Sequence, residues 1–317
     1  MLINTILLVL GFIILIKGAD IFVDGASGIA DSFKMPKLLI GLTIVAFGTS
    51  APEFAVSVKS LLIESGDIVL GNVIGSNILN ILLILGACST IHPLTVKNTT
   101  VKKELPITML ITIAFAILLS DRMIDKSMVN SFTRGDGIVI LLFFLVFIYY
   151  LIAMARKNNN LKEYEKKKTP LSTAILYTIV GTISIIIGSH FVVTSAVELA
   201  TTIGVSERVI ALTIIAFGTS LPELVTSLTA TKKGEYDIAI GNVVGSNIFN
   251  IGVVIGLPVT ILGGISIISF SYIDLIVMII ASVLLFMFSF NDYKITKREG
   301  ITFLLLFITY YSYVLLN

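Results

Sequence analysis

Long apolar runs separated by short polar connections make up almost the whole chain. A helix needs about 20 apolar residues to cross a hydrocarbon core of roughly 30 Å. Glycine and proline inside several runs do not argue against spanning, because packed membrane helices tolerate both. The pattern therefore predicts an all-α integral membrane protein with ten transmembrane helices, at about 2–23, 38–63, 67–91, 104–120, 136–155, 171–193, 208–231, 237–262, 270–290 and 300–316.

A polar, charged stretch at residues 157–170 divides these spans into two groups of five. We expect one five-helix unit over 1–156, a second over 171–317, and a linker between them. Lys and Arg concentrate in this linker and in the other connections that follow odd-numbered spans. Because cytoplasmic loops carry the excess of Lys and Arg, the linker is predicted to be cytoplasmic and both termini to lie outside.

The composition narrows the class of protein further. Hydrophobic residues make up 56% of the chain and charged residues 13%, against about 25% charge in soluble domains. The net charge of +2 argues against a nucleic-acid partner, which needs a clustered basic face, and leaves membrane lipid as the surroundings. The single cysteine, Cys88, excludes an internal disulfide framework. Acidic residues near span ends, including Asp20, Asp24 and Asp237, are expected to be solvated or interfacial.

The strongest feature is an internal repeat at an offset of 170 residues. Residues 41–86 align without a gap to residues 211–256, and 23 of the 46 positions are identical. Both copies contain the patterns GTSxPE and GNVxGSNIxN. Because five spans per half is an odd number, the second copy enters the membrane from the opposite side. The halves are therefore predicted to be inverted-topology repeats, whose broken helices meet near the bilayer midplane around a substrate.

The first repeated pattern places a glutamate deep in the membrane in each half. Glu53 and Glu223 lie about fifteen residues into their spans, where a charge costs roughly 2.5–3.5 kcal/mol. No Lys or Arg is expected at that depth, so the carboxylates must protonate or bind a mobile cation. The prolines that precede them disturb the helix. Freed carbonyls, the carboxylates and nearby hydroxyls together form an oxygen-only ligand set, with the hydroxyls supplied by Thr49, Ser50, Thr219 and Ser220.

The second repeated pattern can complete such a site. Ser76 and Asn80 are four residues apart and share one helix face, as do Ser246 and Asn250. The glycines of this pattern are four apart, a spacing that lets helices approach closely, and its other asparagines are expected to be structural. Oxygen ligands with two carboxylates suit Ca²⁺, and two negative charges also nearly neutralise two or three Na⁺. One site could therefore serve both ions in turn.

These motifs resemble the calcium/cation antiporter superfamily, in particular its prokaryotic sodium/calcium exchangers. The resemblance implies a secondary antiporter in the prokaryotic cell membrane that exchanges Na⁺ for Ca²⁺ by alternating access at one central site, without a cofactor and as a monomer. It also implies that the first and sixth spans form a sliding gate. The ion ligands it implies are Glu53, Glu223, Thr49, Thr219, Ser50, Ser220, Ser76, Ser246, Asn80, Asn250 and the carbonyls of Ala46 and Ala216.

Two departures and several alternatives bear on that expectation. Asn occupies both position 80 and position 250, which looks unlike the potassium-dependent exchangers of this superfamily, which use an Asp at one of these positions. The proton-coupled branch carries a Glu shortly after its Gly-Asn, which is absent here, so proton coupling or transport of another divalent cation is the alternative. A channel is a further alternative, because the repeat can line a pore, and saturating counter-transport would exclude a simple channel. An intramembrane zinc protease would need an H-E-x-x-H helix, and with His92 and His190 alone the chain is not expected to be an enzyme.

Overall fold

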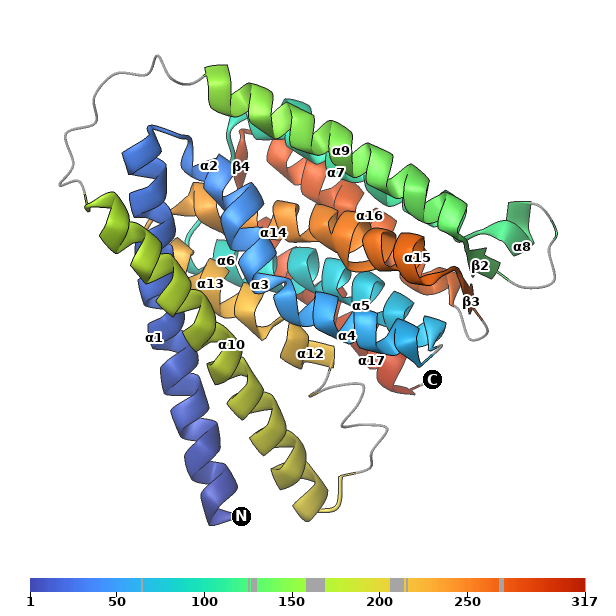
Figure 1. Cartoon of the computed structure of the whole chain (residues 1–317), viewed down its shortest axis with the longest axis horizontal. Helices are drawn as coiled ribbons and strands as arrows, with labels where there is room; N and C mark the ends of the chain where they lie inside the picture. Colours follow the sequence, from blue (N-terminus) through green and yellow to red (C-terminus); the bar gives the residue numbers. More distant parts are fainter. Residues whose placement is uncertain are drawn as a thin grey trace.

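A computed structural model describes residues 1–63, 65–124, 126, 130–157, 169–205, 214, 216–267 and 271–316. Nearly all of these are helical (Figure 1). The helical elements of the first half, with π-helical turns labelled η, are α1 (Leu2–Phe33), α2 (Lys37–Ile40), η1 (Gly41–Val45), α3 (Ala46–Thr49), α4 (Ala51–Leu62), α5 (Gly66–Leu79), η2 (Asn80–Leu85), α6 (Gly86–Ile91), η3 (Thr100–Glu104), α7 (Leu105–Leu118), α8 (Asp121–Ile124) and α9 (Arg134–Lys157). Those of the second half are α10 (Leu171–Thr202), α12 (Ala216–Thr219), α13 (Leu221–Lys232), α14 (Tyr236–Phe249), η6 (Asn250–Gly256), α15 (Leu257–Leu262), α16 (Tyr272–Phe290) and α17 (Lys297–Leu316).

The helices account for most of the predicted spans. Within the described residues, seven helices are long and apolar enough to cross a membrane, or eight if the bent pair Lys37–Thr49 and Ala51–Leu62 counts as one span. The fourth predicted span falls on α7, which has 14 residues and is preceded by η3. The seventh, at 208–231, begins outside the described residues. The full set of ten therefore stays a prediction.

Two predicted spans lie within longer helices. The apolar pattern predicts that the first span ends at residue 23 and the sixth at 193, but α1 continues to Phe33 and α10 to Thr202. Each helix has 32 residues, about 48 Å at 1.5 Å per residue, which exceeds the thickness of a hydrocarbon core. Asp20 and Asp24 lie inside α1 and pair with Lys233, in the connection between α13 and α14. The helix ends at Lys34, whose φ of 53° is left-handed.

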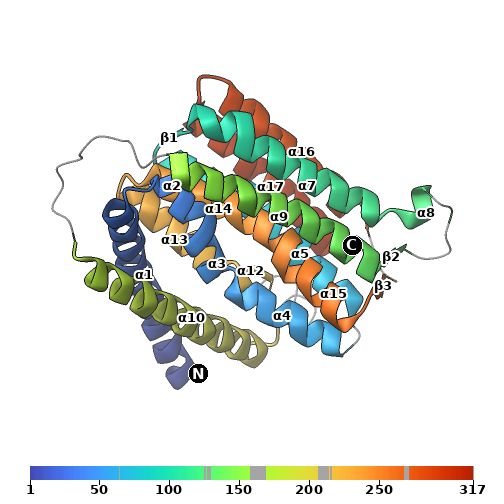
Figure 2. The same ribbon diagram turned by 45° about the horizontal axis from the view of Figure 1, so that its top comes forward.

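α1 and α10 pack against each other in opposite directions along their length (Figures 1 and 2). Gly11 of α1 meets Val192, whereas Gly25, further along, meets Thr178. Positions that advance along α1 therefore retreat along α10. The approach is close because a Cβ on either glycine would come within 2.9 Å of backbone atoms. The two helices of this pair occupy equivalent places in the two halves.

Short strands connect the halves at both ends of the molecule. β1 (Leu94–Thr95) pairs antiparallel with β4 (Lys294–Ile295), and β2 (Asn130–Phe132) with β3 (Ile265–Ile267). Each pair takes one strand from each half. The last helix of each half likewise packs on the other half, α9 on α15 and α17 on α6.

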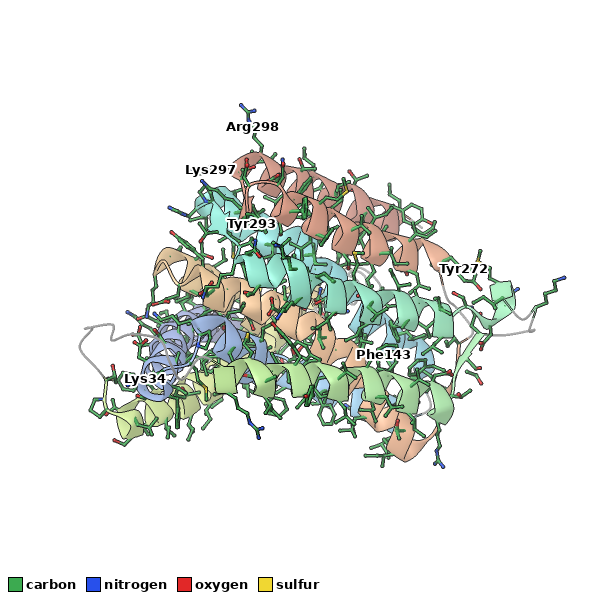
Figure 3. All side chains as sticks on the ribbon, turned by 90° about the horizontal axis from the view of Figure 1, so that it is seen from above. Lys34, Phe143, Tyr272, Tyr293, Lys297 and Arg298 are labelled. Atoms are coloured by element: carbon green, nitrogen blue, oxygen red, sulfur yellow. The ribbon has the colours of Figure 1, made fainter. Side chains whose placement is uncertain are left out.

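The connections gather in two groups. One group holds β1, β4 and the connections at 34–36 and 233–235. The ion pair of Lys37 with Glu235 joins the two connections. The other holds β2, β3 and the start of α5, where Gly66 lies against Ser266. Figure 3 shows basic residues of the first end, Lys34, Lys297 and Arg298, far from Tyr272 at the opposite end. This grouping agrees with a chain that crosses between two faces.

The core forms around α14, the most enclosed of the long helices. In the apolar stretch of Tyr236–Leu262, which contains α14, 94% is buried inside the protein. The equivalent stretch of Gly66–Ile91, which contains α5, is 72% buried. Gly241 and Gly245 explain the difference, because α2 and η1 of the other half come into backbone contact with them. At their counterparts Gly71 and Gly75, a Cβ would have nothing within 4 Å. The expected close packing at these glycines therefore holds in the second half alone.

Candidate functional site

The first repeated pattern breaks its helix, as the prolines predict. The axes of Lys37–Thr49 and Ala51–Leu62 differ by 47°, and the break falls at Ser50, whose ψ of 7° leaves the helical range. In the second half α12 ends at Thr219 and α13 starts at Leu221, with Ser220 in the same conformation. Each glutamate therefore lies in the first turn of a helix that begins inside the protein, where the helix dipole favours negative charge.

Glu53 and Glu223 are buried together between the halves. Each is 1% exposed. Ser50 of the first half donates a 2.9 Å hydrogen bond to Glu223 Oε1, and Ser220 of the second half donates one of 3.3 Å to Glu53 Oε1. Since Ser50 is one turn from Glu53, this exchange places the two carboxyl groups beside each other.

Neither carboxylate has a basic partner among the described residues, where the ion pairs involve Lys37, Lys97 and Lys233. The second oxygen, Oε2, of each glutamate is buried and accepts no hydrogen bond there. A buried carboxylate oxygen without a donor is costly. The arrangement is therefore suited to a positively charged ligand that the protein does not itself provide.

The asparagines of the second pattern fall into two groups. Asn80 and Asn250 donate their amide N–H to Asn247 Oδ1 and Asn77 Oδ1, each at 3.0 Å. Because the amide nitrogens are engaged there, the side-chain carbonyl oxygens of Asn80 and Asn250 remain available as ligands. Both are buried and accept no hydrogen bond from the described residues. Asn77 and Asn247 are the structural pair, since each amide also points at the other's backbone carbonyl, at 3.3 and 3.5 Å.

Asn72 and Asn242 bind the backbone of the two glutamates. Asn72 donates 3.0 Å bonds to the Glu53 carbonyl and to Ser57, and Asn242 donates to the Glu223 carbonyl at 3.4 Å and to Ser227 at 2.9 Å. These bonds fix the turn that carries each carboxylate. The expectation that they are structural residues agrees with these contacts.

A feature that the sequence pattern did not indicate is a pair of widened helical turns. The π-helical turns η2 and η6 begin at Asn80 and Asn250. Single π-helical turns are often found at functional sites. A regular helix expected from the apolar periodicity gives no signal for them, and the repeated Asn at the 170 offset is the one clue in the sequence.

The remaining predicted residues lie around the same centre. The Ser76 and Ser220 hydroxyl oxygens lie 3.2 Å apart, and the Ser246 hydroxyl is buried without a partner among the described atoms. The Thr49 hydroxyl lies 3.0 Å from Asn242 Oδ1 and 3.1 and 3.3 Å from the Val45 and Ala46 carbonyl oxygens, any one of which can accept its proton.

The two alanine carbonyls and Thr219 are less directly described. The Ala46 carbonyl accepts the Ser50 N–H at 3.0 Å, which leaves its second lone pair. Thr219 is half-buried at the end of α12, and Ala216 begins that helix, with its side chain outside the described part. Within the described residues no three His, Cys, Asp or Glu side chains come together, so a cation here would depend on neutral oxygens besides the two carboxylates.

Comparison with known proteins gives a consistent result over the whole chain. The family profile described as sodium/calcium exchanger protein matches residues 3–153 and 173–316. The chain is 38% identical to a putative antiporter, CaxA, of Alkalimonas amylolytica, over 98% of both chains. It is 30% identical to the sodium/calcium exchanger MaX1 of Methanosarcina acetivorans, over 97% of both.

Solved structures agree with the sequence comparison. The fold matches a structure of the sodium-calcium exchanger NCX_Mj soaked with Na⁺, with a TM-score of 0.83, 33% identity and 97% of each chain covered. A second structure, of the same exchanger soaked without Na⁺ or Ca²⁺, gives a TM-score of 0.84 with 99% of each chain covered.

Proposed function

Because the chain belongs to the sodium/calcium exchanger family, we propose that it is a secondary antiporter that exchanges Na⁺ for Ca²⁺ across the cell membrane. The observation that carries the proposal is the buried pair Glu53 and Glu223. Each accepts a hydrogen bond from the other half and keeps one oxygen without a donor. The pair is two negative charges with no basic neighbour among the described residues.

The ligand set explains how one site serves both ions. Ca²⁺ takes six to eight oxygen ligands and tolerates irregular geometry. The two carboxylates neutralise it, and the Asn80, Asn250 and Ser246 oxygens, which have no donor, add neutral ligands. The same charges nearly neutralise two or three Na⁺, so the two substrates compete for one set of oxygens. Counter-transport follows if the site cannot reorient while it is empty and doubly charged.

We further propose that the two halves are inverted repeats with ten spans and that they alternate access. The opposite directions of α1 and α10 support this, as do the strand pairs that exchange between halves. α1 and α10 also cover the two helix breaks. A methyl group on Gly48 would meet Phe22 of α1 at 3.3 Å, and one on Gly218 would meet Val193 of α10 at 2.5 Å. Movement of this pair would therefore uncover the site.

The test is flux driven by a sodium gradient. Purified protein in liposomes loaded with Na⁺ is expected to take up ⁴⁵Ca²⁺ when diluted into Na⁺-free buffer, and to saturate with Ca²⁺. A proton gradient of matched size in the absence of Na⁺ is the control. Uptake driven by the proton gradient alone would favour the proton-coupled alternative, and uptake indifferent to both gradients would reject exchange.

A further inference from the structure

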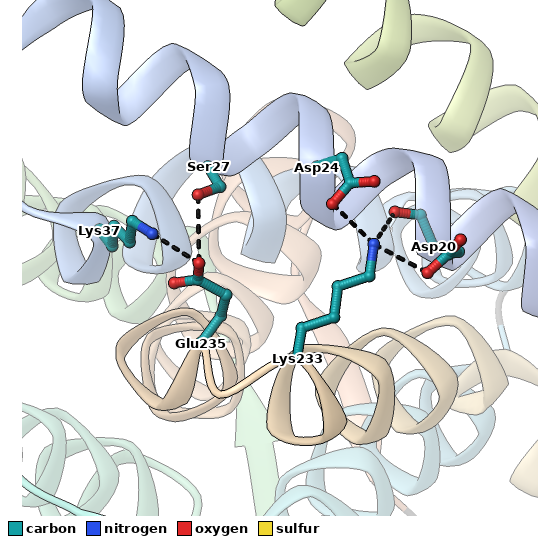
Figure 4. Close-up of polar contacts among 6 residues, drawn as sticks. All are labelled: Asp20, Asp24, Ser27, Lys37, Lys233 and Glu235. Atoms are coloured by element: carbon teal, nitrogen blue, oxygen red, sulfur yellow. Dashed lines mark hydrogen bonds and ion pairs between the residues drawn. The ribbon is translucent and has the colours of Figure 1, made fainter. Parts of the chain in front are cut away.

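A cluster of charged residues outside the candidate site ties α1 to the connection between α13 and α14 (Figure 4). Lys233 forms ion pairs with Asp20 at 2.8 Å and Asp24 at 2.7 Å, and also donates to the Asp20 backbone carbonyl at 2.8 Å. Two residues on, Glu235 accepts from Lys37 at 2.5 Å and from Ser27 at 3.4 Å. The α1 members recur at helical spacing on one face, so the whole contact lies along one side of α1.

The contact joins the helix proposed to move to the part of the molecule that holds the site. α13 begins two residues before Glu223 and ends at the connection that carries Lys233. On the other side, Asp20 and Asp24 flank Phe22, which is 1% exposed and lies against Gly48 at the helix break. A displacement of α1 that withdraws Phe22 from Gly48 would therefore have to stretch the Lys233 ion pairs.

The ion pairs of this cluster are weak enough to break during a conformational change. The Lys233 side chain is 25% exposed, and the aspartates 49% and 56%. Pairs with this much solvent contact each contribute little, and salt weakens them. In this cluster the Lys233 contacts and the Ser27–Glu235 hydrogen bond reach α1, whereas Lys37 lies in α2 and ties the same connection to that helix. The bias on α1 is therefore small and reversible at ordinary temperature.

The second half has no equivalent set. At the offset of 170, Asp20 and Asp24 correspond to His190 and Thr194, and Lys233 corresponds to Ile63. Among the described residues, the oppositely charged pairs therefore lie at the end of the molecule that holds the 233–235 connection. That end is the cytoplasmic one by the distribution of Lys and Arg.

We propose that Lys233 and Glu235, with Asp20, Asp24, Ser27 and Lys37, form a latch that holds α1 against the core and sets how readily the ion site opens to the cytoplasm. The latch rests on the proposed alternating access. Lys233 is a positioning residue, since it touches neither ion nor ligand and acts through α1. When the latch is closed the cytoplasmic entrance is closed, and its rupture shifts the population toward the cytoplasm-facing state.

The test exploits the fact that a population shift has opposite effects on the two sides of the membrane. Lys233→Met is expected to lower the half-saturating Ca²⁺ concentration on the cytoplasmic side by about threefold and to raise it on the outer side, because apparent affinity scales with the fraction of binding-competent protein. Half-saturation is measured in vesicles of defined orientation, with Ca²⁺ applied to one side at a time. Equal shifts on both sides, or none, would overturn the latch.

Matched variants separate the latch from a general effect of charge or folding. Lys232→Met removes the neighbouring exposed lysine, the last residue of α13, and is expected to leave both sides unchanged. Asp24→Asn is expected to reproduce Lys233→Met in part, and the double variant to equal Lys233→Met rather than the product of the two effects. Additive effects would show that the two residues act independently and would overturn the proposal.

A cross-linking experiment tests the latch by measuring exchange instead of apparent Ca²⁺ affinity. In a Cys88→Ala background, which removes the single native cysteine, Asp24→Cys and Lys233→Cys are joined by a cleavable bifunctional maleimide. Exchange is expected to stop on cross-linking and to return when the cross-link is cleaved. Ca²⁺ binding from the outer side is expected to persist in the cross-linked protein. Exchange that continues in the cross-linked protein would refute the latch. Absence of sodium-driven flux in the untreated wild type would instead refute the proposed exchange.

Discussion

The hydroxyl of Ser50 donates a 2.9 Å hydrogen bond to Glu223, a residue 173 positions away in the chain. Ser220 makes the reciprocal bond to Glu53, at 3.3 Å. Each half thus holds the other half's carboxylate, and the candidate site is formed by residues of both halves. The predictions below follow from this exchange and from the packing around it.

Removal of either carboxylate charge is expected to abolish exchange. Glu53→Gln and Glu223→Gln each leave a single negative charge for Ca²⁺, and affinity at such sites depends strongly on the number of charged ligands. Sodium-driven ⁴⁵Ca²⁺ uptake should fall by about 100-fold or more in both variants, with the protein still monodisperse. Glu198→Gln, at an exposed glutamate of α10, is the control and should transport normally. Robust uptake by either site variant would contradict the two-carboxylate site.

The serine hydroxyls are expected to matter less than the carboxylates, and unequally. Ser50→Ala removes the shorter bond and Ser220→Ala the longer one, and a hydrogen bond to a charged group contributes about 1.5–3 kcal/mol. Ca²⁺ binding measured by calorimetry should weaken by about tenfold in each variant, and more in Ser50→Ala. Ser282→Ala, where the hydroxyl donates to the Met278 carbonyl of its own helix, should bind normally. Unchanged binding in both site variants would show that the crossed bonds do not position the carboxylates.

Protons are expected to compete with Ca²⁺ at the paired glutamates. Ca²⁺ binds the ionised carboxylates, so binding must release any protons they carry. Acidification should therefore weaken binding, with a steepness that approaches about two protons per Ca²⁺ in the wild type and about one in Glu53→Gln, provided that variant retains measurable binding. Titration of Ca²⁺ binding at stepped pH makes the comparison. A flat profile would be incompatible with the site.

Exchange of three Na⁺ for one Ca²⁺ is expected to move one net charge per cycle. A membrane potential then contributes about 2.3 kcal/mol per 100 mV to the driving force. In Na⁺-loaded vesicles, each cycle of Ca²⁺ uptake carries one net positive charge outward. An inside-positive K⁺ diffusion potential imposed with valinomycin should therefore accelerate uptake, and an inside-negative one should slow it. Uptake that is insensitive to the potential would indicate an electroneutral stoichiometry of two to one.

Equivalent glycines of the two halves are expected to differ in their tolerance of a methyl group. At Gly245 a Cβ would come within 2.7 Å of the Ala46 Cβ and 2.9 Å of Leu42 backbone atoms, whereas Gly75 has nothing within 4 Å. Gly245→Ala should destabilise the protein by about 1–3 kcal/mol, and Gly75→Ala should be neutral. Monodispersity after heating, followed by size-exclusion chromatography, compares them. Equal stability would show that α14 and η1 are less closely packed than the structure indicates.

Much of this protein could be predicted from local pattern. The bounds of α4 and α13, and of α5 and α14, differ by the same 170 residues as the sequence repeat, because the repeated segments share the GTSxPE and GNVxGSNIxN patterns that set their breaks. Glu53 and Glu223 were identifiable since a carboxylate in a long apolar run needs an explanation that few structural roles supply. The Ser and Asn candidates followed from their spacing on a helix.

Only the tertiary structure decided which residues face each other. Asp20 and Asp24 were expected to be solvated or interfacial, and they are about half exposed. Their pairing with Lys233, more than 200 positions away, was not indicated by the sequence. The pairing of Ser50 with the opposite glutamate, the π-helical turns at Asn80 and Asn250, and the unequal packing of Gly75 and Gly245 were equally hidden. The sequence repeats itself, and so it determined the elements and the chemistry of each half. Contacts between the halves depend on how two similar but non-identical surfaces fit together, and that fit is set by three-dimensional packing rather than by any periodicity along the chain.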